Sequence, residues 1–167
     1  MNWKPVPDLD ELKKYYEYNP ETGVVILKEM RCNSDAKRVG KRIGNLRKRN
    51  NRLVWTINHE YKNFYLSRFI WKIMTGEDPG KFIVEHKNRD STDNRWCNLR
   101  LATVPQNAVN KFSMGYSKIK NSGKYRVRVT VDGKRVSIGN FDKEEDAKRA
   151  LTKARKQYYG EFACLEL

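Results

Sequence analysis

The 167 residues include 35 Lys and Arg against 20 Asp and Glu, which gives a formal net charge of +15. A surplus of this size favours a polyanionic partner, either nucleic acid or an anionic membrane surface, over an ordinary solvated surface. No apolar run approaches the roughly 20 residues that span a bilayer, and the N-terminal residues lack the apolar core of a signal peptide. The three cysteines are far apart and indicate neither a zinc knuckle nor a disulfide framework. We therefore expect a cytoplasmic protein that is not secreted, with free thiols and no membrane partner.

The first residues predict a helix followed by a strand. The helix covers residues 8–18, because their apolar side chains have helical spacing. It ends at the Asn-Pro pair of residues 19 and 20, and a turn with a glycine leads into an apolar strand over residues 24–27.

The stretch from residue 37 to residue 52 contains eight basic residues and no acidic one. Gly40 and Gly44 interrupt it, so we predict a loop or an irregular arm rather than a helix. The length of this arm and its lack of counter-charges favour contact with phosphates over a solvated face. From it we select Lys48 and Arg49 as DNA contacts.

Two strands and a helix are predicted next. The strands cover residues 53–57 and 64–66 around a turn at residues 58–60, and a short buried helix covers residues 68–74. His59 falls in the turn, so we interpret it as an exposed histidine rather than a metal ligand.

A short apolar strand at residues 82–84 runs directly into Glu85 and His86. The following twelve residues, KNRDSTDNRWCN, are polar and rich in turn formers, and order returns with a second short strand at residues 99–101. The pattern therefore predicts two strands joined by a polar loop.

A helix is predicted from residue 105 to about residue 111, because a Thr and a Gln stand at the spacing of a capping box. Asn107 lies in its first turn. Strand, loop, strand and helix form a ββα unit, in which the end of the first strand and the first helical turn come together. Glu85, His86 and Asn107 are then expected to share one face.

Residues 125–131 alternate strictly between apolar and polar side chains, which predicts a strand. Asp132-Gly133 is a two-residue hairpin signal, and an amphipathic helix is predicted over residues 143–159. The apolar side chains pack on this helix and leave a polar face open. A small sheet with a basic face suits the width of the DNA major groove, and we favour this reading over a solvated face. The residues expected on the open face are Arg126, Arg128, Thr130, Arg135 and Ser137.

Hydrolysis of a phosphodiester needs a base for the attacking water and an electrophile for the charge on the phosphate. The unperturbed pKa of histidine is about 6.5, so a neutral His86 suits the role of base. Mg²⁺ takes oxygen ligands, which Glu85 and the side-chain carbonyl of Asn107 can supply. Asn98 lies in the loop between them. Each residue alone is weak evidence, because Glu-His pairs and loop asparagines are usually structural.

Residues 84–111, VEHKNRDSTDNRWCNLRLATVPQNAVNK, resemble the HNH endonucleases of phages and group I introns. The shared pattern is an acidic residue and a histidine at a strand end, followed in order by DNR, NLR and TxxQNxxN. The resemblance implies that His86 is the general base and that Asn98 orients His86 or ties the loop. It also implies that Glu85 and Asn107 hold one Mg²⁺ or Mn²⁺ ion, with Asn107 in the position where many relatives have a third histidine.

Two positions depart from the usual pattern of this family. Glu85 stands where aspartate is more common, so its longer side chain is expected to bind metal at a shifted position. Ser67-Arg68 stands where relatives usually have His-Arg before an apolar helix, so any contribution of that histidine is absent. Neither departure removes the base or the two ligands, and we expect activity.

Residues 116–165 resemble an AP2-type DNA-binding domain in three segments, GKYRVRV, GKRVSIGNF and EEDAKRALTKARKQYYGEFA. Plant relatives have tryptophans on the DNA-binding face where this chain has Ser122 and Ser137, so their base-reading code does not transfer. The DNA contacts that the resemblance implies are Lys118, Lys120, Arg126, Arg128, Thr130, Arg135 and Ser137.

Together the patterns predict an α+β protein with a ββα-metal HNH nuclease core and a small three-stranded antiparallel sheet packed on one helix. The expected regions are a basic DNA-contacting region (1–77), the nuclease core (78–113) and an AP2-like domain (114–167). The expected function is that of a site-specific homing endonuclease that cuts double-stranded DNA as a monomer or weak dimer, without a small-molecule substrate, in the cytoplasm of the host cell if a phage carries it. The alternatives are a catalytically silent AP2-like DNA-binding regulator and, on charge alone, an RNA-binding protein.

Overall fold

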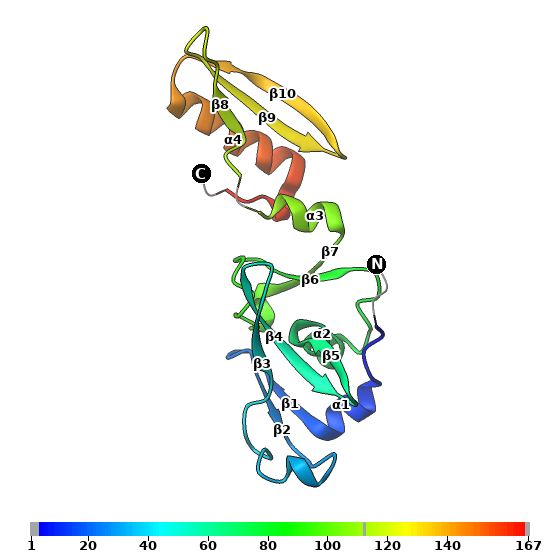
Figure 1. The fold of residues 1–167 in the computed structure, drawn as a ribbon. Helices are drawn as coiled ribbons and strands as arrows, with labels where there is room; N and C mark the ends of the chain where they lie inside the picture. The colour runs from blue at the N-terminus through cyan, green and yellow to red at the C-terminus, as the bar shows by residue number, and fades with distance from the viewer. Residues whose placement is uncertain (1–3, 112, 166–167) are drawn as a thin grey trace. The chain divides into compact units, whose positions relative to one another are not determined.

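The structure, a computed structural model, describes residues 4–111 and 113–165. It divides into two compact units, Met1–Thr103 and Val104–Leu167, each with its own hydrophobic core (Figure 1). Both units contain helices and strands, so the prediction of a mixed α and β protein is confirmed. The assignment of three functional regions stays a prediction. Within the described ranges, no helix has the length and apolar character needed to cross a membrane.

The first unit contains three small antiparallel sheets, β1-β2, β3-β4-β5 and β6-β7. Its elements in chain order are α1 (Leu9–Tyr15), β1 (Tyr16–Asn19), β2 (Val24–Leu27), η1 (Asn33–Asp35), β3 (Asn45–Arg49), β4 (Arg52–His59), β5 (Lys62–Tyr65), α2 (Leu66–Thr75), β6 (Ile83–His86), η2 (Trp96–Asn98) and β7 (Leu99–Ala102).

One hydrophobic core joins these elements. Leu12 of α1, Phe69 and Ile70 of α2, and Val25 and Leu27 of β2 are fully buried in it. α2 provides a strongly apolar face and ends at Gly76, which has a positive φ of 80° and whose N–H donates to the carbonyl of Lys72. The β6-β7 ribbon contributes Val84 and Leu99 to the same core, so the strand that carries His86 is fixed to the body of the unit.

The first predicted helix is shorter than expected, because the chain leaves the helix at Tyr15 and Tyr16–Asn19 pairs with Val24–Leu27. The Asn19 side chain accepts hydrogen bonds from the N–H groups of Glu21 and Thr22, both at 3.0 Å, and thereby closes the turn. The hairpin gains backbone pairing and core contacts that helical spacing alone does not reveal.

The basic arm is also more regular than predicted. Residues 45–49 form the strand β3, which pairs with β4 through a tight turn at Asn50 and Asn51. Both turn residues have positive φ angles, 47° and 60°, as a type I′ turn requires. Asparagine tolerates this conformation, so the Asn50-Asn51 pair is a hairpin signal. The prediction of a loop rested on Gly40 and Gly44 and missed this pair.

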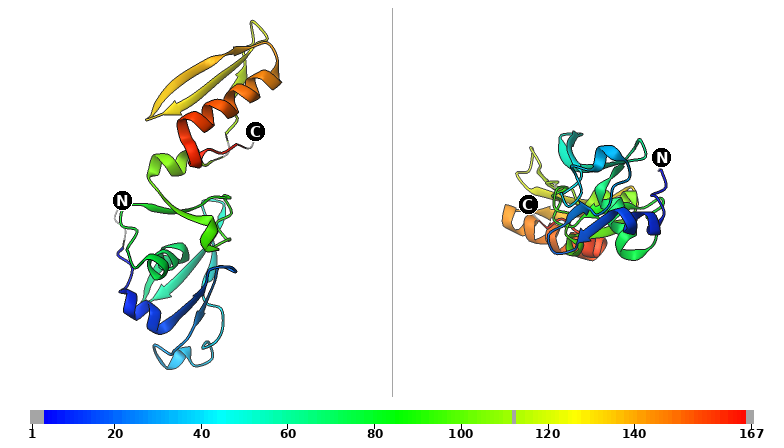
Figure 2. Two further views of the ribbon diagram at one scale, coloured as in Figure 1. Left: turned by 180° about the vertical axis from the view of Figure 1, so that it is seen from behind. Right: turned by 90° about the horizontal axis from the view of Figure 1, so that it is seen from below.

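The second unit is a three-stranded antiparallel sheet, in the order β10-β9-β8, covered on one face by α4 (Figures 1 and 2). The Asp132-Gly133 turn has positive φ angles of 48° and 77°, as the hairpin prediction requires. Val127 and Val129 are buried against Ala147 and Leu151 of the helix. The elements of this unit are α3 (Val104–Val109), β8 (Tyr116–Lys118), β9 (Tyr125–Val131), β10 (Lys134–Phe141), α4 (Glu144–Tyr159) and η3 (Gly160–Phe162).

Strand β8 is too short to pair with the whole of β9, and a side chain completes the pairing. Tyr116–Lys118 reaches only the first residues of β9. Beyond it, the Tyr159 hydroxyl accepts a hydrogen bond from the Thr130 N–H at 2.9 Å and donates one to the Thr130 carbonyl at 3.0 Å. The end of α4 is thereby fixed to the strand whose polar side chains face outward.

We expect Gly23→Ala to destabilise the first unit far more than Gly40→Ala. Both glycines have positive φ, 72° and 76°, so either alanine costs about 1–2 kcal/mol of backbone strain. A Cβ on Gly23 would lie 2.6 Å from backbone atoms of Asn94 and Arg95, whereas nothing lies within 4 Å of one on Gly40. The clash adds about 1–3 kcal/mol.

Tryptophan fluorescence during chemical denaturation measures this difference, because all four tryptophans precede residue 104. Equal shifts of the unfolding midpoint in the two variants would show that the close approach at Gly23 has no energetic weight.

Candidate active site

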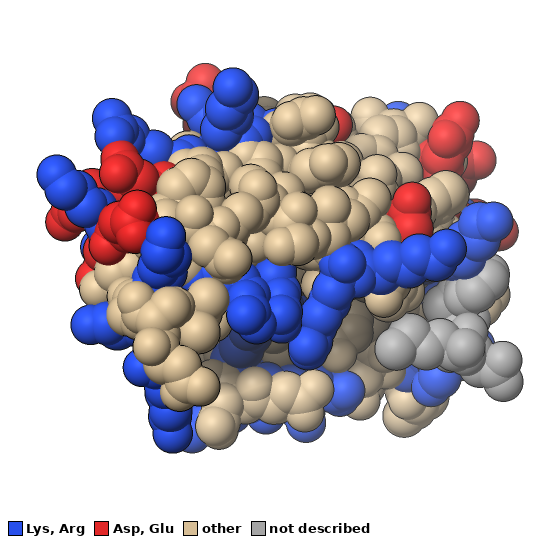
Figure 3. Space-filling model, turned by 90° about the horizontal axis from the view of Figure 1, so that it is seen from above, with Lys and Arg blue, Asp and Glu red and all other residues tan. Residues whose placement is uncertain are grey.

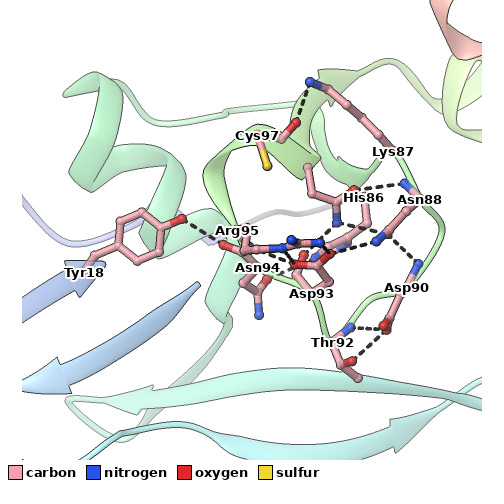
Figure 4. Close-up of polar contacts among 11 residues, drawn as sticks. Tyr18, His86, Lys87, Asn88, Asp90, Thr92, Asp93, Asn94, Arg95 and Cys97 are labelled. Atoms are coloured by element: carbon pink, nitrogen blue, oxygen red, sulfur yellow. Dashed lines mark hydrogen bonds and ion pairs between the residues drawn. The ribbon is translucent and has the colours of Figure 1, made fainter. Parts of the chain in front are cut away.

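A polar loop joins β6 to β7, and hydrogen bonds that involve its side chains hold it together (Figure 4). His86 is the last residue of β6 and is half-buried. Its Nε2 atom lies 3.0 Å from Oδ1 of Asn94, a side chain that is only 3% exposed. Burial lowers the pKa of His86, against the opposing effects of the Asn94 hydrogen bond and of the carboxylates of Asp90 and Asp93. The ring is therefore neutral near pH 7, the state in which a histidine accepts a proton.

Asn98 ties the two ends of the loop together. Its Oδ1 accepts from the Asn88 N–H at 2.9 Å, and its Nδ2 donates to Asn88 Oδ1 at 3.0 Å and to the Asp93 carbonyl at 2.7 Å. The sequence left two roles open for Asn98, orientation of His86 or restraint of the loop. These contacts are those of a loop restraint.

Asp93 supports the loop through its charge. Its carboxylate accepts hydrogen bonds from Arg95, at 2.8 Å from Nε and 2.6 Å from Nη2, and from Asn88 Nδ2 at 2.8 Å. The hydrogen bonds from Arg95 are the main cause that lowers the pKa of Asp93 to about 2. The charged form of Asp93 is thus the form that stabilises the loop.

Glu85 contacts a different partner from its neighbour. It lies opposite Arg100 in the β6-β7 register, and its Oε1 accepts from Arg100 Nε at 2.5 Å. The Glu85 side chain is nearly fully buried, and within the described part of the chain its second oxygen, Oε2, has no hydrogen-bond partner. Buried polar atoms without hydrogen-bond partners are rare, because they destabilise the folded state. A ligand bound at Oε2 would remove this cost.

Asn107 lies on α3, in the second unit, where it is half-buried. Glu85, His86 and Asn98 lie within the first unit, each with its own hydrogen-bond partners, whereas Asn107 belongs to the unit that begins at Val104. The expectation that Asn107 shares one face with Glu85 and His86 stays a prediction.

The contacts of Asn94 and Arg100 were not predicted from the sequence. Asn94 lies in the motif DNR and Arg100 lies in the motif NLR. The motifs therefore indicated the positions of these residues but not what they contact. The contact of Asn94 depends on how the loop folds back, and the contact of Arg100 depends on the register between β6 and β7. Local sequence pattern predicts neither.

His59 is not the exposed turn residue that was expected. It is the last residue of β4 and only 1% exposed, with its Nδ1 2.7 Å from the Tyr16 hydroxyl and its Nε2 2.8 Å from Glu11 Oε1. Donor atoms of Glu11, His59 and Glu60 lie within 4.8 Å of one another and could hold a metal ion. Both ring nitrogens already have partners on α1 and β1, and these contacts suffice to account for a buried histidine.

The residues predicted to contact DNA lie on two surfaces. In the first unit, Lys48 and Arg49 are exposed on β3, and Ser91 Oγ in the His86 loop donates to the Leu53 carbonyl at 2.7 Å. Because Lys48 is the cross-strand partner of Leu53, this hydrogen bond joins the basic hairpin to the loop.

In the second unit, the sheet face opposite α4 is hollowed, with a volume of about 250 Å³. Lys118, Lys120, Arg128, Thr130, Arg135 and Ser137 are exposed and Arg126 is half-buried. Lysine and arginine side chains are prominent on the molecular face drawn in Figure 3. The residues that line the hollow are Gly115, Tyr116, Ser117, Arg126, Arg128, Thr130 and Arg135.

Residues 64–109, from the end of β5 to the end of α3, match the family described as HNH endonuclease. This stretch of the chain therefore has the sequence pattern of an HNH endonuclease domain. A curated protein of Acanthamoeba polyphaga mimivirus, the uncharacterized HNH endonuclease L560, is 31% identical over 114 residues, which cover 65% of this chain and 60% of that protein. The chain thus spans about 60% of the length of this relative.

Among solved structures, one described as DNA binding and cleavage by the HNH homing endonuclease I-HmuI is similar with a TM-score of 0.42 and 18% identity. The alignment covers 95% of this chain and 91% of that chain.

We expect the first unit to lose stability as the pH falls from about 4 toward 2. The pKa of Asp93 is lowered from 3.8 to about 2, so the contribution of its charged form is present above the ordinary pKa and is lost on approach to the lowered one. Asp93→Asn removes this contribution at every pH. The difference in unfolding midpoint between the two proteins, followed by tryptophan fluorescence, should therefore shrink with acidification. A difference that stays constant from pH 5 to pH 2.5 would contradict this assignment.

Proposed function

We propose that this protein is a DNA endonuclease of the HNH homing type, which hydrolyses a phosphodiester with His86 as general base and one divalent metal ion. The observation that carries the proposal is the His86 ring, held by Asn94 at the end of β6 inside a segment with the HNH sequence pattern. Removal of a proton from water requires a neutral base within reach of the substrate, and the lowered pKa of His86 provides that state.

Glu85 is a suitable metal ligand because its buried Oε2 has no partner within the described chain. Arg100 occupies the other oxygen, so Glu85 offers a single oxygen while the ion pair is kept. We assign the second ligand to the side-chain carbonyl of Asn107. Mg²⁺ or Mn²⁺ accepts such a set, with its remaining positions taken by water and phosphate. When bound, the ion stabilises negative charge on the phosphate and the leaving oxygen.

DNA binding is assigned to the two basic surfaces. The β3-β4 hairpin, joined to the His86 loop by Ser91, would hold phosphates next to the site of cleavage. The β8-β9-β10 sheet face, with three arginines around its hollow, would read the duplex as an AP2-like module. We therefore propose double-stranded DNA as the substrate, with 5′-phosphate and 3′-hydroxyl products.

A single site per chain cuts one strand, so a monomer would nick and a double-strand break would need a weak dimer or a second event. We place the protein in the cytoplasm of the host cell, with a phage as its carrier. The rival function is a silent DNA-binding regulator, which the sheet face alone would serve. The opposing observation is Oε2 of Glu85, a buried atom that has no hydrogen-bond partner in residues 4–111 and 113–165 and that a regulator has no reason to retain.

His86→Ala should slow the nicking of supercoiled plasmid in Mg²⁺ by about two to four orders of magnitude, because it removes the general base. Duplex affinity should change little, since the ring is not among the basic groups that bind phosphate. Cys97→Ala is the matched control, because the Cys97 side chain is exposed in the same loop. A chelator should stop the wild-type reaction and Mg²⁺ should restore it. Undiminished cutting by the His86 variant would remove His86 from the mechanism, and no cutting by the wild type on any DNA tested would favour the regulator.

Arg126→Ala and Arg128→Ala should each weaken binding to duplex DNA. A side chain that contacts a base edge should cost about 1–3 kcal/mol and relax preference at one base pair. A side chain that contacts phosphate should lower affinity evenly across sequences, with a salt slope shallower by about one, and we expect this second result for Lys48→Ala. Lys153→Ala, an exposed residue of α4, is the control. Competition between duplex DNA and RNA belongs in the same titrations. Preference for RNA, or loss of binding only in the control, would overturn this assignment.

A further inference from the structure

We propose that Asn94 is a positioning residue for His86: its side-chain carbonyl oxygen holds the ring proton on Nε2 and so places the basic lone pair on Nδ1. The inference rests on the proposed function for its catalytic meaning, since it names the ring atom that accepts the proton from water. Asn94 itself would touch neither water nor phosphate.

The contact has the geometry that this role needs. Asn94 Oδ1 lies 3.0 Å from Nε2 of His86, within the range of a hydrogen bond. A carbonyl oxygen only accepts hydrogen bonds, so the neutral ring must donate from Nε2. A neutral imidazole carries one proton, and its lone pair then resides on Nδ1.

The position of Asn94 is fixed from outside the loop. The Tyr18 hydroxyl on β1 donates to the Asn94 carbonyl at 2.8 Å, and burial raises the pKa of Tyr18, which keeps the donor proton in place. The Trp96 N–H donates to the Pro20 carbonyl at 3.0 Å, and Gly23 closely approaches the backbone of Asn94. The β1-β2 hairpin thus holds the backbone from which the carboxamide reaches His86 (Figure 4).

The other end of the Asn94 carboxamide argues against a purely structural role. Its Nδ2 is buried and has no hydrogen-bond partner in the described part of the chain. Leaving such a buried donor unsatisfied lowers the stability of the folded state. A side chain retained for folding alone would satisfy both ends, whereas here the satisfied end is the oxygen that faces His86. Asn98, by contrast, uses both ends of its carboxamide within the loop. The two asparagines therefore divide the work, with Asn98 restraining the backbone and Asn94 orienting the ring.

Nuclear magnetic resonance tests the proposal without any enzymatic assay. The full chain contains only two histidines, so ¹⁵N-histidine labelling gives two ring spin systems, and His86→Gln assigns them. Long-range ¹H–¹⁵N spectra at a pH where the ring is neutral should show the His86 proton on Nε2. Asn94→Ala should give a mixture of tautomers. Asn88→Ala, which removes loop hydrogen bonds without touching the ring contact, should leave the tautomer unchanged.

Nicking kinetics supply the second measurement. Asn94→Ala should lower kcat about 10- to 100-fold, the usual effect of removing a partner that orients a reacting histidine, with KM for DNA little changed. Asn94→Asp keeps an oxygen acceptor at the same place and should restore most of kcat, whereas the near-isosteric Asn94→Leu should not. A loss confined to the amount of folded protein would not follow this order.

A His86 proton found on Nδ1 in the wild type, or a tautomer that is the same in wild type and Asn94→Leu, would overturn the proposal. If Asn94→Ala does not fold, the wild-type spectrum and the near-isosteric Asn94→Leu still decide. An Nε2 proton that depends on Asn94, in a wild-type protein that cuts no DNA, would support the positioning contact and reject the nuclease function.

Discussion

The turn of the first hairpin packs against the backbone of the loop that follows β6, and the candidate site depends on this contact. Only a glycine fits at position 23, because a Cβ there would lie 2.6 Å from the backbone of Asn94 and Arg95. Tyr18 on the same hairpin holds the Asn94 carbonyl. The β1-β2 hairpin belongs to the hydrophobic core, so the rigidity of the core is transmitted to the partner of His86. The hairpin thereby fixes the backbone of the residue that contacts the His86 ring.

A second constraint is the buried ion pair next to His86. Glu85 and Arg100 form an ion pair in which both side chains are largely shielded from water. Breaking such a pair by removing one partner costs about 3–5 kcal/mol, because it leaves an uncompensated charge. Arg100 balances the charge of the buried Glu85, and Oε2 of Glu85 has no hydrogen-bond partner among the described residues. An unsatisfied buried oxygen costs stability locally, and proteins accept such local costs at functional sites.

Local pattern predicted the elements whose partners are near in sequence. The alternation over residues 125–131 and the Asp132-Gly133 turn set which side chains of β9 face outward, because both act over a few residues. Local pattern failed where contacts between segments far apart in the sequence determine the structure. The helix ended early because β1 pairs with β2, and His59 is buried because it contacts Glu11 and Tyr16, which are distant in the sequence. The motif marked His86 correctly as the end of a strand. Its partner could not be predicted, because Asn94 reaches the ring only after the loop folds back on the hairpin.

The sheet face of the second unit that lies opposite α4 carries a concentration of positive charge. Three arginines line one hollow of about 250 Å³, and none of the residues that line it is acidic. Like charges on one sheet face repel one another, and the alternation of side chains along β9 places Arg126 and Arg128 on the same face two residues apart. Burial of Val127 and Val129 under α4 holds that face together despite the repulsion. If this face binds DNA as proposed, a phosphate backbone would replace repulsion by attraction, and DNA binding would stabilise this unit. Because salt screens both terms, a unit that gains stability from DNA at low salt should gain progressively less as salt rises.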